Sequence, residues 1–322
     1  MTRHFLRKKK FWIRLTVLVF AVPILLLTIA LGILYLEQDD LIQSEINALN
    51  KGHKGKISIG ETHLEPFANF PYISIKVDNV RILESKDSTA EVLLDVKDIY
   101  TGFNVWDILQ GNYDIKNILI EDGLLNLIFH KDGTLNIQNA LQTTQESEGG
   151  SPMDIHLKNI QLRNIDLHKL DEATNVDVET FIYYAKGGFQ TAGDIINAHI
   201  DTEFELNIVD NGDSTYIKRK HFEFHTDLSL NDKTGLLTLK PSGIRMEHGD
   251  FDIQGSIDFK NEATLDLAVK GTKPNFDMLI AFAPEDLIPV LERYKNAGNI
   301  YFNAVVKGPT LHGIMPFIDA NF

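Results

Sequence analysis

Three residues on one predicted strand have the types and the spacing that a metal site would need. His221, Glu223 and His225 alternate along the chain, so their side chains would share one face of a strand. Two imidazoles and a carboxylate can hold zinc. Polar residues at alternate positions are also typical of the solvent face of an ordinary strand. We prefer this second interpretation, and no metal is predicted.

No other segment has the pattern of a catalytic or cofactor-binding motif. The zinc-protease, nucleophile-elbow and dinucleotide-binding patterns do not occur in the sequence, and there is no cysteine for thiol chemistry. Residues 52–56 (GHKGK) are too short for a phosphate loop and lack a Ser or Thr after the lysine. Adjacent acids such as Asp171 and Glu172 are typical of a solvated surface. We therefore predict no catalytic residues, no cofactor and no enzymatic activity.

The charge balance excludes several classes of partner. The 322-residue chain has 31 Lys and Arg against 45 Asp and Glu, a net charge of −14. Six of the bases precede residue 15, which leaves 25 against the same 45 acids in the rest of the chain. An acidic body argues against nucleic acid, which needs basic patches, and against broad electrostatic adhesion to anionic lipid.

One long apolar stretch predicts a membrane anchor. Residues 15–36 (LTVLVFAVPILLLTIALGILYL) contain no charged residue, and as a helix they would be about 33 Å long, against about 30 Å of bilayer hydrocarbon. Basic residues precede the stretch and acids follow it, which places residues 1–14 in the cytoplasm and the remainder outside. A cleaved signal peptide is the alternative, but the best small-residue site, at residues 30–32, is followed by bulky residues. We predict a single-pass anchor in a bacterial inner membrane, with the body in the periplasm.

After the anchor, a short helical segment at 37–50 leads into apolar residues with a period of two, which is typical of half-buried strands. Two strands are predicted at 113–120 and 124–130, joined by a turn at 121–123. The alternation slips by one residue at Asn159 and Asn164, which indicates β-bulges or bends. The polar segment 142–152 reads as a linker between a first module, 37–141, and a second β region, 153–322, with a helical segment near 275–296.

The predicted fold class is mainly β, with antiparallel strands that are apolar on one face and polar on the other. Two architectures satisfy this pattern. In a closed sandwich or barrel the apolar faces meet. In a long curved sheet the apolar face stays available to an apolar ligand. The alternation does not choose between them, and the sandwich is the commoner architecture.

Residues 107–136 (DILQGNYDIKNILIEDGLLNLIFHKDGTLN) resemble the hallmark of the AsmA family. The resemblance rests on Ile108–Gly111, Ile118–Ile120 and Asp132–Asn136, and on the N-terminal anchor. It implies a repeated β-groove whose first part is chorein-like, and a role in moving phospholipid between the inner and outer membranes or in outer-membrane biogenesis. Family members are usually longer, so the resemblance also predicts a truncated member that works with a protein partner or a missing C-terminal continuation.

A groove of this kind would be lined by alternate apolar residues. The candidates are Ile73, Ile75, Val77, Leu125, Leu127, Phe129, Phe204, Leu206, Phe222 and Phe224. The same residues would form the core of a closed sandwich. The second functional hypothesis is an envelope assembly or scaffold factor that binds other proteins without transferring lipid.

Overall fold

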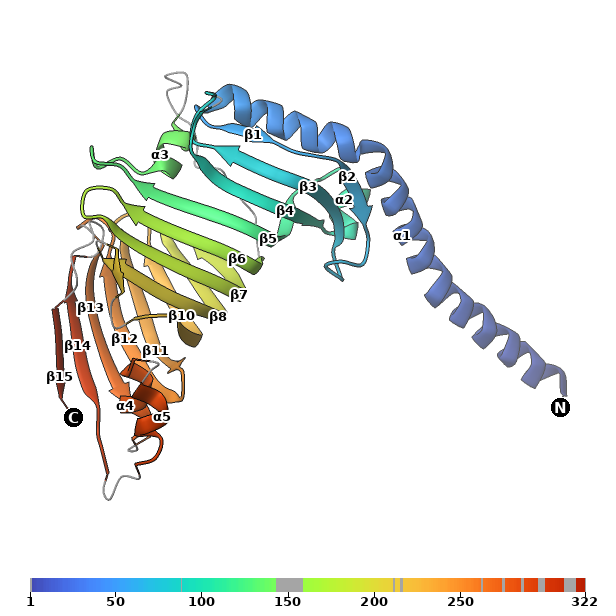
Figure 1. Cartoon of the computed structure of the whole chain (residues 1–322). Coiled ribbons are helices and arrows are strands. Elements are labelled where there is room, and N and C mark those ends of the chain that lie inside the picture. Colours follow the sequence, from blue (N-terminus) through green and yellow to red (C-terminus); the bar gives the residue numbers. More distant parts are fainter. Residues whose placement is uncertain are drawn as a thin grey trace.

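The chain forms one large, curved and unclosed β-sheet with a long N-terminal helix at one end (Figure 1). The computed structural model describes residues 2–87, 89–142, 159–210, 212–214, 217–261, 263–273, 276–284, 287–294, 299–309 and 317–321. The side chains of residues 2–20, 23, 45, 213–214, 279 and 317–321 are outside the description. The mainly β fold class is confirmed, and the open sheet rather than the closed sandwich is the architecture.

The described strands belong to a single 15-stranded sheet. They are β1 (Lys56–Ser58), β2 (Thr62–Glu65), β3 (Ile73–Leu83), β4 (Val92–Phe103), β5 (Ile115–Phe129), β6 (Asn159–Asp171), β7 (Val176–Ala192), β8 (Ile195–Asp210), β9 (Asp213–Ser214), β10 (Lys220–Asn231), β11 (Leu236–Met246), β12 (Gly249–Asp258), β13 (Thr264–Gly271), β14 (Asn303–Gly308) and β15 (Phe317–Asn321). From β3 onward the strands pair in chain order, except that β9 pairs only with the end of β8, while β1 and β2 both pair with β3.

One pair departs from the predicted antiparallel arrangement, because β5 and β6 are parallel. A parallel pair needs a connection that returns to the same end of the sheet. The described part of this connection includes the short helix α3 (Asn136–Leu141). Residues 143–152 of the predicted linker lie outside the described residues, so the division into two modules at 142–152 stays a prediction.

The helices are few and lie at the two ends of the sheet. The helix α1 (Thr2–Gly52) runs beside β1 and β2 with its C-terminal part, and its N-terminal part projects away from the sheet (Figure 1). The short helix α2 (Val105–Leu109) follows β4, where Asn104 caps it by accepting a hydrogen bond from the Trp106 amide. Two short helices, α4 (Asp277–Phe282) and α5 (Ile288–Leu291), lie within the helical segment predicted near 275–296.

The predicted anchor, residues 15–36, is helical as part of α1. Among the described residues, no helix is long and apolar enough to cross a membrane. Residues 15–20 and Pro23 fall outside the part of α1 whose side chains are described. The transmembrane segment therefore stays a prediction.

A row of extra residues bends the N-terminal half of the sheet. Asn79, Lys97, Asp122, Asn164 and Tyr183 face one another across β3 to β7, and each interrupts the alternation of its strand by one position. Three of them, the two asparagines and the aspartate, have left-handed backbones with φ between 51° and 55°. Extra residues of this kind bend a strand and increase its twist. Because all five strands carry one at the same level, the apolar face continues on both sides of the bend.

The predicted turn at 121–123 is therefore wrong. Asp122 and Gly123 lie within one continuous strand, β5, rather than between two strands. An Asp-Gly pair suits a left-handed turn residue, and here the left-handed residue is used for a bend. Gly123 instead lies against the backbone of Val96 on the neighbouring strand, where there is no room for a side chain. The bend expected at Asn164 is present.

Candidate functional site

The strand register places all ten predicted groove residues on one face of the sheet. Residues opposite each other on paired strands share a face, so the face can be followed from strand to strand. Leu125 pairs with Leu167, Leu167 with Thr180, and Thr180 with Leu206. Phe204, two positions from Leu206 on β8, pairs with Phe222. We call this surface the apolar face, and it continues through β13, where Leu265, Leu267 and Val269 lie on it.

The apolar face is covered at its N-terminal end. Ile73, Ile75 and Val77 of β3 are buried in a cluster with Ala30, Leu34 and Ile42 of α1 and with Ile108 of α2. The buried α1 residues, Ala30, Leu34, Gln38 and Ile42, recur every four positions along the helix, which gives it one mainly apolar stripe toward the sheet. Ile73, Ile75 and Val77 are thus residues of a packed core, and the prediction that they line an open groove is wrong. The alternation of the strand could not predict this burial, because the covering side chains come from α1, a different segment of the chain.

A second cluster covers the C-terminal end of the same face. Met278 and Ala281 of α4 are buried against Phe222, Met246 and Phe251. Phe251 meets the rings of Phe282 and Phe302 edge-on, with centroids 5.6 Å and 5.5 Å apart. This arrangement is favourable for aromatic pairs. Figure 1 shows α4 and α5 against the ends of β11 and β12, on the side toward which the sheet curves.

Between the two clusters the apolar face is open. Leu125, Leu127, Leu206 and Phe224 are half-buried, although each is large and apolar. No helix among the described residues packs extensively on β6 to β8, although Ile165 of β6 and Ile182 of β7 are buried in the first cluster. Phe204 stacks on Phe222 with ring centroids 5.1 Å apart, and it touches both clusters. The open part is therefore continuous with both clusters, and its side chains are only partly buried by one another. Phe129 and Phe222 are buried at its margins.

Two lysines on the apolar face were not predicted as part of it. Lys220 is 2% exposed, and its Nζ donates a hydrogen bond to the carbonyl oxygen of Ala283 at 2.5 Å. Lys169 lies over the ring of Phe129, 5.2 Å from its centroid, and burial lowers the pKa of its ammonium group against the opposing effect of Asp171. The only sequence signal for either residue is a charge at an apolar position of the alternation.

The opposite face of the sheet is polar and contains the histidines first considered for zinc. His225 Nδ1 lies 2.5 Å from an oxygen of Asp201, and His221 Nε2 lies 3.3 Å from one of Glu203. Glu223 forms an ion pair with Arg245. The hydrogen bond from His225 lowers the pKa of Asp201. Within the described part of the chain, no group of three such side chains is arranged to hold a metal ion. The structure thus pairs the two histidines with neighbouring acids and Glu223 with an arginine.

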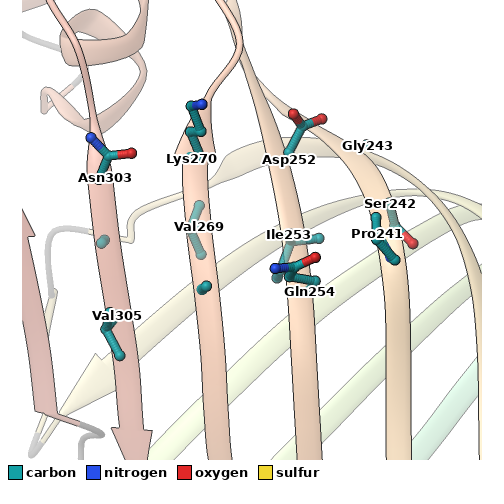
Figure 2. Close-up of a pocket in the computed structure, with 12 residues that line it drawn as sticks. Pro241, Ser242, Gly243, Asp252, Ile253, Gln254, Val269, Lys270, Asn303 and Val305 are labelled. Atoms are coloured by element: carbon teal, nitrogen blue, oxygen red, sulfur yellow. The ribbon is translucent and has the colours of Figure 1, made fainter.

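A shallow depression of about 560 Å³ lies across β11 to β14. Asp252, Lys270 and Asn303 come from three neighbouring strands and lie at one level in it (Figure 2). Ile253 and Val269 also line the depression. The residues that line it include no cysteine and no histidine. Its serine, Ser242, bonds through its hydroxyl to Thr226 and to the Lys240 carbonyl rather than to a base. The depression offers no arrangement for covalent chemistry.

The fold and the apolar face together define an open, curved β-sheet protein with one continuous apolar surface. Comparison with known proteins adds no identification: no family model matches the chain, and no curated protein matches it. The AsmA resemblance therefore stays a prediction.

Proposed function

We propose that the protein binds the acyl chains of phospholipids on the open part of its apolar face and acts in lipid transport rather than catalysis. The observation that carries the proposal is the half-buried stretch of β5 to β10, which is apolar and continuous with a packed core at each end. Water contact of a 16-carbon chain costs roughly 12 kcal/mol at about 0.8 kcal/mol per CH₂. A continuous apolar surface offsets this cost, and the headgroup stays in water at the edge.

The proposed setting is a bacterial inner membrane, with residues 15–36 as a single span and the sheet in the periplasm. Six large hydrophobic residues of α1 are exposed in the described part of this stretch, namely Val22, Ile24, Leu25, Ile29, Tyr35 and Leu36. Apolar side chains exposed along a projecting helix suit surroundings of lipid. In this setting the protein would move phospholipid toward the outer membrane or support outer-membrane biogenesis.

Site-specific photocrosslinking tests lipid binding directly. A benzophenone amino acid is introduced at Leu127 or Leu206 on the apolar face, and at Lys97 on the polar face as the matched control. Cells are grown with radioactive phosphate, irradiated, and the purified protein is examined for a labelled phospholipid adduct. We expect adducts at Leu127 and Leu206 and none at Lys97. Equal labelling at all three positions, or none at any, would contradict the proposal that the apolar face binds lipid.

The orientation of the anchor has its own test, because the chain lacks cysteine. Single cysteines are introduced at Thr2 and at Ser147, and intact cells are treated with a membrane-impermeant maleimide. The charge asymmetry around residues 15–36 leads us to expect labelling at residue 147 and not at residue 2. Labelling at residue 2 and not at residue 147 would mean that the N-terminus lies outside and the sheet lies in the cytoplasm.

A further inference from the structure

Large aromatic side chains are exposed at one corner of the molecule. Phe67 is 72% exposed, Phe70 is 79% exposed and Trp106 is 61% exposed. On the neighbouring α1, Tyr35 and Leu36 are exposed as well. Single exposed apolar residues are ordinary on a protein surface, but a group of this size at one place marks an interaction surface. We call Phe67, Phe70 and Trp106 the aromatic rim.

The topology brings the three residues of the rim to the same edge of the sheet. Phe67 and Phe70 lie in the connection from β2 to β3, and Trp106 lies in α2, directly after β4. Ile73 at the start of β3 pairs with Phe103 at the end of β4. The two aromatic segments therefore leave adjacent strand ends. Figure 1 shows α2 and the ends of β2 and β3 beside the point where α1 leaves the sheet.

Hydrogen bonds hold α1 at this corner. The Tyr113 hydroxyl donates to Glu37 Oε2 at 2.6 Å, and the Thr62 hydroxyl donates to Asp39. The helix is thus fixed to the sheet directly after the proposed membrane span, residues 15–36. The rim consequently lies at the height along α1 where the span ends.

This position selects the partner. Trp and other aromatic side chains favour the boundary between hydrocarbon and headgroups, where a large ring is accommodated. The same corner carries Glu37, Asp39, Asp40 and Asp107, so attraction to anionic headgroups is not the source of binding. We propose that the aromatic rim inserts into the surface of the membrane that holds α1, in contact with zwitterionic phospholipid. The proposal rests on the anchor put forward above, and it places one edge of the apolar face at the bilayer surface.

Tryptophan fluorescence in vesicles tests the insertion. The chain has two tryptophans, Trp12 and Trp106, so the Trp12→Phe variant reports on the rim alone. The full-length variant is reconstituted into phosphatidylcholine vesicles whose acyl chains carry bromine near the headgroup. We expect Trp106 to lose most of its emission relative to vesicles without bromine. Changing Phe67 and Phe70 together to Ser should weaken this quenching, with the circular dichroism spectrum unchanged.

The matched control moves the tryptophan away from the rim. Phe259 is also exposed and lies in the turn after β12, seven strands along the sheet from β4. With Trp12 and Trp106 both changed to Phe, Phe259→Trp should keep its emission in brominated vesicles. A protein that floats with the vesicles but whose Trp106 is quenched no more than this control would overturn the rim while leaving the anchor intact. A protein that does not float with the vesicles would overturn both.

Discussion

Ile75 and Leu127 lie on the same face of the same sheet, and both come from strands with the same alternation of apolar and polar residues. Ile75 is completely buried beneath α1 and α2, whereas Leu127, two strands away, is only half-buried, although Asn136 of α3 bonds to the backbone of β5 beside it. The comparison shows that an apolar strand pattern specifies a face and not its use. A covering helix makes a core of that face, and an uncovered stretch remains available to a ligand.

The largest effect expected from this comparison follows from placing a carboxylate at each position. Ile75→Asp buries an unpaired charge, and we expect it to cost about 3–5 kcal/mol or more of unfolding free energy. Leu127→Asp should cost much less, because its carboxylate can reach water from the open face. Urea unfolding followed by circular dichroism measures both. Equal losses would mean that the open region is in fact a closed core.

The cover at the C-terminal end allows a second comparison. Met278 of α4 is 1% exposed, so Met278→Ala leaves a cavity and should cost about 2–5 kcal/mol. Leu228 on β10 is half-buried on the same face. Leu228→Ala should cost only about 1 kcal/mol, since less apolar area is lost. If the two variants have the same stability, α4 does not pack on the sheet as described.

The bend in the covered half gives a smaller effect. A Cβ at residue 123 would lie 2.5 Å from the Cα of Val96 and still closer to the carbonyl oxygen of Asp95. Both neighbours are backbone atoms, so Gly123→Ala must displace a strand, at about 1–3 kcal/mol. Gly243 on β11 has nothing within 4 Å of the same position, and Gly243→Ala should stay within about 0.5 kcal/mol of the parent. The difference between their unfolding free energies measures how tightly the bend is packed.

The smallest effect concerns a histidine at the end of β5. Burial opposes the charged form of His130, but the hydrogen bond to Glu84 at 3.0 Å and the charges of Glu84 and Glu172 outweigh it and raise the pKa of the imidazole. A pKa raised by folding stabilises the protein fully below the unfolded value of about 6.5. This contribution is lost as the pH rises through the folded value.

The parent should therefore lose roughly 0.5 kcal/mol relative to His130→Gln as the pH rises through this window. Unfolding free energies at pH 6 and at pH 8.5 test the sign. A parent that gains stability over the variant at the higher pH would contradict the pairing with Glu84.

Much of the local structure followed from the sequence. The period of two predicted strands such as β3 and β4, and the slip at Asn164 predicted a bend that the structure contains. The alternation also put all ten groove candidates on a common face. These features depend on neighbouring residues, because the side chains of a strand point alternately to its two faces. At Asp122 and Gly123 local information was ambiguous, since a left-handed residue serves a turn and a bend equally well.

Tertiary structure alone decided the rest. It paired β5 with β6 in parallel, kept the sheet open, and placed α1 over Ile73, Ile75 and Val77 while leaving Leu127 and Leu206 only half-buried. None of this can be read from alternation, because a strand has the same apolar pattern whether a helix, a second sheet or a ligand covers it. Burial depends on which distant segment packs against the face, and that contact is made only when the whole chain folds.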